Sequence, residues 1–174
     1  MHTFEPASSG RSKCRGCGQA LERGALRFGE RLPNSYGEGE MILWFHPLCA
    51  AYKRPDALVA ALHTAGTNVP AAASLERIAQ HSLQHPRLTR IDGAERAPGG
   101  QAKCRHCHEN IERGVWRIRI VHHDEGGRFN PGGFIHVGCS TPYCETVADP
   151  EHILHFSRDL SADERASLEK ALQS

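Results

Sequence analysis

The sequence predicts an α+β fold in which two small modules, each a β-hairpin or small antiparallel sheet with helices, follow one another along the chain. Three observations support this prediction. A pattern of cysteine and histidine occurs twice with a shift of 90 residues, each copy contains stretches that alternate apolar and polar residues, and helical patterns follow downstream. Because aromatic residues make up only 6% of the chain, the hydrophobic cores are expected to be small and to need additional support.

The repeated pattern contains four residues of metal-ligating types in each copy. Both copies read Cys-x2-Cys, then 28 residues, then His-x2-Cys, and the surrounding stretches KCRGCGQALERG and KCRHCHENIERG also match. Four coincident residues and a shared turn are very improbable by chance, so we interpret the chain as a duplicated module. The candidate ligands are Cys14, Cys17, His46 and Cys49 in the first copy and Cys104, Cys107, His136 and Cys139 in the second.

The chemistry of these residues favours structural zinc over the other uses of a Cys-x2-Cys motif. Three thiolates and one imidazole complete a tetrahedral zinc shell and leave no position for a catalytic water. A c-type haem site needs a histidine after the second cysteine, but the first copy has Gly18 there. A thioredoxin-like dithiol would leave the paired His-x2-Cys unexplained. We therefore expect two Zn²⁺ ions.

Two further residues near these motifs receive no ligand role. Cys144, the seventh cysteine, has no counterpart in the first copy, where position 54 is Arg54. It is interpreted as a small structural or unpaired thiol. His108 is adjacent to a ligand and is interpreted as a surface residue of the Cys-x2-Cys turn.

After each Cys-x2-Cys turn the sequence predicts a hairpin that ends at the histidine ligand. A polar loop, PNSYGEGE or DEGGRFNPGG, separates the two strands of each hairpin. On the first strand, apolar residues are expected to face the core and arginines to face solvent. The inward residues are Leu26, Phe28, Trp116, Ile118 and Ile120, and the outward residues are Arg27, Arg31, Arg117 and Arg119.

Helices are expected downstream of each hairpin. Helical spacing predicts helices over 55–66 and 74–83, and a capping-box pattern at Ser161 predicts a helix that carries Leu168 and Leu172. The segment between the modules is rich in turn-forming and charged residues, which is typical of a linker. The predicted organisation is a first module over 1–83, a linker over 84–101 and a second module over 102–174.

Charge and hydropathy limit the expected partners. The formal net charge is +1, but residues 11–54 hold eight Lys/Arg against four Glu, whereas residues 141–174 hold three against seven Asp/Glu. No stretch approaches the roughly 18 apolar residues of a membrane span, and the N-terminus lacks the apolar region of a signal peptide. We expect no membrane partner and no small-molecule substrate. The expected location is the cytoplasm, with nucleoid association in a bacterial host, or the nucleus in a eukaryote.

The first copy resembles the PARP-type zinc finger of poly(ADP-ribose) polymerases and of some eukaryotic DNA ligases. The resemblance lies in SGRSKCRGCGQALERGALRFGERL and WFHPLC. The second copy is similar through CRHCHENIERGVWRI and IHVGC, and its tail ILHFSRDLSADERASLEKAL resembles the segment that closes the finger. This resemblance implies recognition of nicks, gaps or ends in DNA. In the family, a basic face holds phosphates, and apolar side chains stack on the base pair that the break exposes.

The residues that match the family motif give a set of candidate DNA contacts. The resemblance implies phosphate contacts by Arg11, Arg27 and Arg117 and stacking by Met41 and Pro131. Other candidates come from the loops, the strand faces and the flanks of the ligand cysteines: Tyr36, Phe129, Arg31, Arg119, Lys13, Arg15, Lys103 and Arg105. The second copy departs from the family because it has Gln101 in place of Arg11 and Phe134-Ile135 in place of Trp44-Phe45.

Three functional hypotheses follow. The preferred one is a non-enzymatic sensor of DNA strand breaks that protects the break or recruits a DNA ligase or polymerase, because no catalytic domain of either kind fits in the remaining residues. The second is a zinc-organised protein-interaction module, which the low net charge and the acidic C-terminal helix favour. The third is a zinc enzyme such as a nucleobase deaminase, which is disfavoured by the full metal shells and by the missing His-x-Glu signature beside a Cys-x2-Cys.

Overall fold

The computed structural model describes residues 1–65 and 68–174 and has the α+β fold that the sequence predicts. The chain divides into two compact units: Met1–Gln84 with Glu125–Gly127, and His85–Asp124 with Arg128–Ser174. Each unit contains a three-stranded antiparallel sheet, several helices and one group of three cysteines and a histidine. None of the helices within the described ranges has the length and apolarity needed to cross a membrane.

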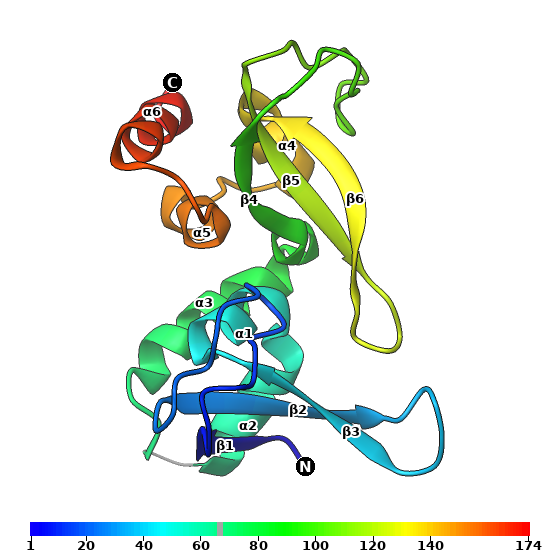
Figure 1. Ribbon diagram of the computed structural model, residues 1–174, viewed down its shortest axis with the longest axis vertical. Helices are drawn as coiled ribbons and strands as arrows, with labels where there is room; N and C mark the ends of the chain where they lie inside the picture. The colour runs from blue at the N-terminus through cyan, green and yellow to red at the C-terminus, as the bar shows by residue number, and fades with distance from the viewer. Residues whose placement is uncertain (66–67) are drawn as a thin grey trace. The chain divides into compact units, whose positions relative to one another are not determined.

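The first unit is built on a sheet with the strand order β1-β2-β3. Its strands are β1 (Thr3–Pro6), β2 (Leu26–Pro33) and β3 (Glu40–Phe45). β2 and β3 form the predicted hairpin, and β1 pairs with the other edge of β2 so that Glu5 lies opposite Arg27. The helices of this unit are α1 (Pro47–Lys53), α2 (Pro55–Ala65) and α3 (Ala72–Gln84). They gather beside the sheet (Figure 1).

The two helices predicted in this unit are confirmed. The prediction over 55–66 corresponds to α2, with residue 66 outside the described residues, and the prediction over 74–83 lies within α3. Upstream of them, Pro47 occupies the first turn of α1, where the missing N–H breaks no helical hydrogen bond. The helix therefore begins directly after His46 and places Cys49 in its first turn.

A small core joins the sheet to the helices of the first unit. Phe28 on β2 lies opposite Phe45 on β3, and both rings are fully buried with their centroids 6.3 Å apart. Leu21, upstream of β2, and Leu58, on α2, are also completely buried. Two aromatic rings and a few aliphatic side chains form a thin core, which agrees with the low aromatic content.

The second unit has the same sheet topology, with the order β4-β5-β6. Its strands are β4 (Ile91–Arg96), β5 (Trp116–His123) and β6 (Phe129–His136). Short 3₁₀ helices η2 (Pro86–Arg90) and η3 (Val137–Cys139) flank the sheet in sequence. Three α-helices complete the unit: α4 (Ser140–Cys144), α5 (Pro150–Phe156) and α6 (Ala162–Leu172).

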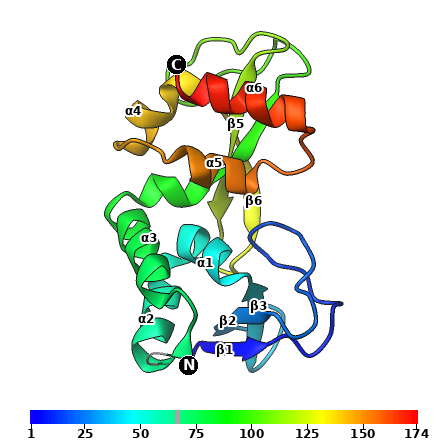
Figure 2. The same ribbon diagram turned by 90° about the vertical axis from the view of Figure 1, so that its left-hand side faces the viewer.

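The predicted inward face of β5 and the predicted C-terminal helix are confirmed. Trp116, Ile118 and Ile120 are all buried in the second core. The Ser161 hydroxyl accepts the Glu164 N–H at the start of α6, and the Glu164 carboxylate accepts the Ser161 N–H, which forms the predicted capping box. Figure 2 shows α5 and α6 in front of the sheet, and the side chain of Leu168 is completely buried in the core of this unit.

The prediction of a linker over 84–101 is wrong. Residues 86–96 form η2 and β4, and β4 is the edge strand that pairs with β5. Ile91, Ala94 and Ala97 are buried in the second core. The strand is short, bulged and interrupted by Gly93, so its apolar residues show no regular alternation. Without that alternation, the sequence of the segment resembles a linker.

With β4 included, the two units repeat the same backbone arrangement at a shift of 90 residues. The Gly24 N–H donates to the Ala7 carbonyl at 2.8 Å, and the Gly114 N–H donates to the Ala97 carbonyl at 2.8 Å. The N–H of Arg15 likewise donates to β3, at the Trp44 carbonyl, and the corresponding bond in the second unit runs from Arg105 to Phe134. The duplicated part therefore begins before the Cys-x2-Cys turn and includes β1 and β4.

Candidate metal centres and candidate nucleic-acid interface

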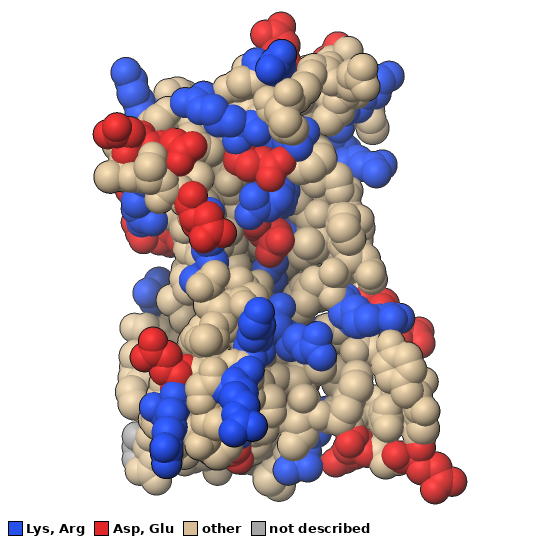
Figure 3. Space-filling model, viewed as in Figure 1, with Lys and Arg blue, Asp and Glu red and all other residues tan. Residues whose placement is uncertain are grey.

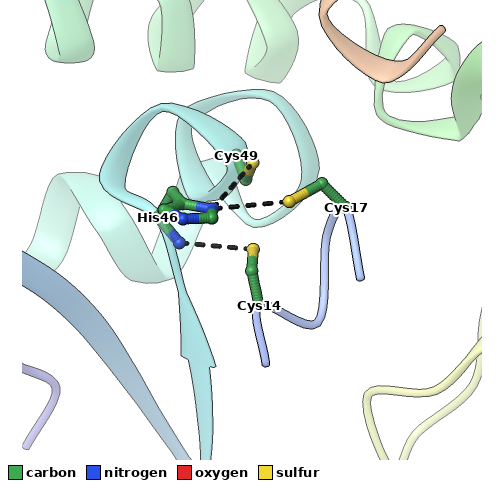
Figure 4. A group of neighbouring side chains, drawn as sticks. All are labelled: Cys14, Cys17, His46 and Cys49. Atoms are coloured by element: carbon green, nitrogen blue, oxygen red, sulfur yellow. Dashed lines mark hydrogen bonds between the residues drawn. The ribbon is translucent and has the colours of Figure 1, made fainter. Parts of the chain in front are cut away.

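The first candidate metal centre joins the turn before β2 to the junction between β3 and α1. Cys14 and Cys17 lie on the turn, His46 follows the last residue of β3, and Cys49 lies in the first turn of α1. Figure 4 shows the four side chains pointing toward one another. All four ligand atoms lie within 4.8 Å of one another.

The distances within this group match a tetrahedral zinc site. The Nδ1 atom of His46 lies 3.4 Å from the sulfur of Cys17 and 3.9 Å from that of Cys49. Zinc bonds of normal length in a tetrahedral shell separate nitrogen and sulfur by about 3.5 Å. The His46 N–H donates to the sulfur of Cys14 at 3.3 Å, as expected for a thiolate ligand. The group fits one zinc ion and binds β3, α1 and the turn together.

The second centre has the same geometry. Its Nδ1 atom, on His136, lies 3.4 Å from the sulfur of Cys107 and 3.9 Å from that of Cys139. The other ring nitrogen of His136 lies 3.3 Å from the Asn110 carbonyl oxygen, an acceptor that favours the tautomer in which Nδ1 can bind a metal. Cys104 completes the set, and no disulfide joins any of these cysteines. The protein thus has two Cys3His groups that fit two zinc ions.

The acid–base properties of the ligands indicate that each group needs a cation. In the first centre, hydrogen bonds from Cys14 and Cys49 lower the pKa of the Cys17 thiol, whereas a hydrogen bond with Cys14 raises the pKa of Cys49. In the second, burial acts to raise the pKa of Cys104, but backbone N–H groups outweigh it and lower that pKa to about 6. Three thiolates this close repel one another, so full ionisation requires a bound cation.

The two centres differ in exposure and in one backbone position. Cys14 and Cys49 are buried in the first centre, whereas Cys107 is exposed in the second. The residue after the second cysteine has a positive φ in both turns, 73° at Gly18 and 64° at His108. A residue with a Cβ is strained in this left-handed conformation, by about 1–2 kcal/mol.

We predict that His108→Gly stabilises the second unit by about 1 kcal/mol, because the substitution removes this strain. The reciprocal Gly18→His is expected to destabilise the first unit by a similar amount. Thermal unfolding of the zinc-loaded variants measures both changes. A loss of stability in His108→Gly would show instead that the imidazole makes a contact that the fold requires.

Cys144 lies outside both centres. Its thiol is buried in the second core, and burial raises its pKa to about 11 against the opposing effect of Arg87 and Arg90. A protonated, buried thiol packs as a small apolar group. This agrees with the interpretation of Cys144 as a structural residue.

The predicted DNA contacts beside the metal ligands are exposed cations. Arg11, Lys13 and Arg15 flank Cys14, and Lys103 and Arg105 flank Cys104. Figure 3 shows Lys and Arg side chains close together on the part of the visible face that belongs to the first unit. The zinc-bound turn would hold their backbone in place, so these side chains form the accessible part of the predicted interface.

The predicted stacking residues differ in how far they are exposed. Tyr36, in the loop between β2 and β3, is 78% exposed, whereas Met41 at the start of β3 is half-buried. In the second unit Pro131 is exposed, and Phe129 packs edge-on against His123 with ring centroids 4.5 Å apart. Tyr36 is therefore the more accessible aromatic ring of the two hairpins.

The predicted outward arginines of the strands are not a free basic face. Arg27 and Arg117 are each 6% exposed, and each forms an ion pair with a glutamate on the neighbouring strand. Arg31 pairs with Glu40 at 3.6 Å. Period-2 alternation correctly separates these arginines from the apolar core residues, but it does not reveal that Arg27 and Arg117 are covered as well.

In the second unit a single glutamate serves two strand arginines. Glu95 accepts hydrogen bonds from Arg117 and Arg119, and Arg119 also donates to the Asp92 carbonyl at 2.8 Å. Burial acts to raise the pKa of Glu95, but the two arginines outweigh it and hold that pKa below its ordinary value of 4.5. Sequence reasoning missed Glu5 and Glu95, although the two glutamates are themselves related by the 90-residue shift.

Comparison with known proteins gives one informative match. No family model matches the chain. A poly(ADP-ribose) polymerase from Sarcophaga peregrina is 26% identical to it in an alignment that covers 97% of this chain and 19% of the polymerase. The chain thus spans about a fifth of the length of this relative. The alignment includes both units and agrees with the resemblance noted in the Cys/His motifs.

Proposed function

We propose that this protein is a zinc-organised DNA-binding protein that recognises strand breaks. The observation that carries the proposal is that the first unit has two features together. Exposed cations lie beside the turn that the metal group holds, and the hairpin loop carries a highly exposed aromatic ring, Tyr36. Cations bind phosphates irrespective of sequence, and an exposed ring can stack on a base pair that a break uncovers. The similarity to a poly(ADP-ribose) polymerase supports the same function.

In this proposal the protein binds DNA and is not itself an enzyme. Each Cys3His group supplies four protein ligands, which is typical of structural zinc sites rather than catalytic ones. A strand-break sensor of this kind would mark nicked or gapped DNA for repair and recruit the enzyme that closes the break, a DNA ligase or polymerase. It would act in the nucleoid of a bacterium or in a nucleus.

Fluorescence anisotropy with matched intact, nicked and gapped DNA hairpins at several salt concentrations tests the proposal. We expect tighter binding to broken duplexes and an affinity that falls steeply with salt. Arg11→Ala is expected to weaken binding to all three hairpins and to reduce the salt slope by about 1. Tyr36→Ala is expected to reduce the preference for broken DNA, because stacking contributes about 1–3 kcal/mol per base.

Arg77→Ala serves as the matched control, since Arg77 is an exposed arginine on α3 of the same unit. It should leave both the affinity and the salt slope unchanged. Equal affinity for intact and nicked hairpins would contradict strand-break recognition. Absence of salt-dependent binding would contradict DNA binding altogether and favour a protein-interaction module.

A further inference from the structure

Each unit contains a buried arginine that lies between an aromatic ring and a glutamate. In the first unit these residues are Arg27, Trp44 and Glu5, and in the second they are Arg117, Phe134 and Glu95. All three positions differ by 90 residues between the units, so the arrangement belongs to the duplicated module. We refer to Arg27 and Arg117 as the capped arginines and to Glu5 and Glu95 as their caps.

The aromatic ring and the cap contact different parts of the guanidinium. The central carbon of the Arg27 guanidinium lies 3.6 Å from the centroid of the Trp44 ring, so one face of the group is covered. Its Nη2 donates to Glu5 at 2.6 Å, and its Nη1 lies 3.4 Å from the Ser12 hydroxyl. In the second unit, Arg117 lies 3.4 Å from the centroid of the Phe134 ring and donates to Glu95 through both Nε and Nη2.

The caps, and not the arginines, face solvent. The side chain of Glu5 is 43% exposed and that of Glu95 is 33% exposed, whereas the side chains of Arg27 and Arg117 are 7% and 8% exposed. Because the aromatic ring fixes the guanidinium from one side, removal of the cap would expose an oriented hydrogen-bonding edge without further rearrangement. Such an edge binds phosphate oxygens with the same geometry as carboxylate oxygens.

The first unit has two further features that point to an anion. The Nε of Arg27 is buried without a hydrogen-bond acceptor among the described residues, so Glu5 does not satisfy the guanidinium completely. Ser12, which contacts Arg27, lies in sequence between the exposed cations Arg11 and Lys13. The capped arginine is therefore next to the basic part of the predicted interface.

We propose that Glu5 and Glu95 are internal carboxylate caps on oxyanion sites, and that a phosphate oxygen replaces the cap at the capped arginine when the protein binds. The role of the caps in DNA binding rests on the proposed function. The presence of an oxyanion site at each capped arginine does not depend on it. The cap lowers affinity for all phosphates, and it keeps the arginine oriented when no ligand is bound. The site in the first unit binds phosphate more tightly than that in the second. Release of Glu5 breaks its ion pair with one arginine, whereas release of Glu95 breaks ion pairs with two.

Glu5→Gln tests the proposal, because the amide keeps the shape of the cap and loses its charge. DNA affinity is expected to rise about 3- to 10-fold, because the phosphate at Arg27 no longer has a carboxylate beside it. The salt slope is expected to steepen by up to about 0.9, because the charge of Arg27 is no longer offset by that of Glu5. Inorganic phosphate at constant ionic strength is expected to raise the melting temperature of Glu5→Gln more than that of the wild type.

Glu22→Gln is the matched control, because Glu22 is an exposed glutamate of the same unit and its loss changes the net charge equally. It should reproduce neither the steeper salt slope nor the response to phosphate. The double variant Glu5→Gln/Arg27→Lys should lose the gain, since lysine has no planar edge. If Glu5→Gln does not fold, Glu95→Gln with its control Glu112→Gln repeats the test in the second unit.

The possible outcomes separate the two proposals. A response to phosphate together with tighter DNA binding supports both the oxyanion site and its role in DNA binding. A response to phosphate in a protein that binds no DNA supports the oxyanion site and refutes the proposed function. Unchanged or weaker DNA binding by Glu5→Gln without a response to phosphate overturns the inference and leaves the pair as a structural ion pair only.

Discussion

Replacing Cys14 with serine is expected to release the zinc ion of the first unit and to unfold that unit. Cys14 is buried, and its sulfur accepts the backbone N–H of His46 in addition to facing the other ligands. Structural zinc sites supply about 10–16 kcal/mol of apparent binding free energy, which exceeds the whole stability of a typical small domain. The thin core around Phe28 and Phe45 cannot replace that contribution.

Elemental analysis and amide hydrogen exchange test this prediction together. The zinc content should fall from two ions per chain to one, and protection should be lost in β2, β3 and α1. Cys144→Ser is the matched control, because Cys144 is buried but belongs to neither metal group. It should keep both zinc ions. Retention of two zinc ions in Cys14→Ser would show that Cys14 is not a ligand.

The metal groups could be predicted from the sequence because a ligand set is a small number of residue types at fixed spacing. The 90-residue shift identified all eight residues that the structure brings together. The hairpins and the three longer helices α2, α3 and α6 were also predictable, since their apolar residues follow regular periods. These features depend on local sequence, and local sequence was sufficient for them. The short helices α1, α4 and α5 were not predicted.

The environment of the strand arginines depends on more than local sequence. Arg27 is buried because Trp44 covers it from β3 and Glu5 reaches it from β1, and neither residue is near it in the chain. Alternation along one strand predicts which residues share a face, but it does not predict what covers that face. The assumption that polar residues face solvent therefore failed for these arginines.

β4 was missed for a related reason, and Gly93 provides the test of its role. Gly93→Ala is expected to destabilise the second unit by about 3–5 kcal/mol through strain and overpacking together. Gly93 has a φ of 86°, and an added Cβ would overlap the carbonyl group of Phe156 and lie 2.7 Å from the backbone nitrogen of Ser157. Because both neighbours are backbone atoms at the end of α5, a side-chain movement cannot relieve the overlap.

Gly99→Ala is the matched control, because Gly99 belongs to the same segment and an added Cβ there would meet no atom within 4 Å. Chemical denaturation should show a large loss of stability for Gly93→Ala and almost none for Gly99→Ala. If the segment 84–101 were a linker, both substitutions would be equally harmless, since an alanine in a flexible tether contacts nothing. A difference between them would show that β4 and α5 pack closely in solution, and that the duplicated module begins at its edge strand rather than at its first cysteine.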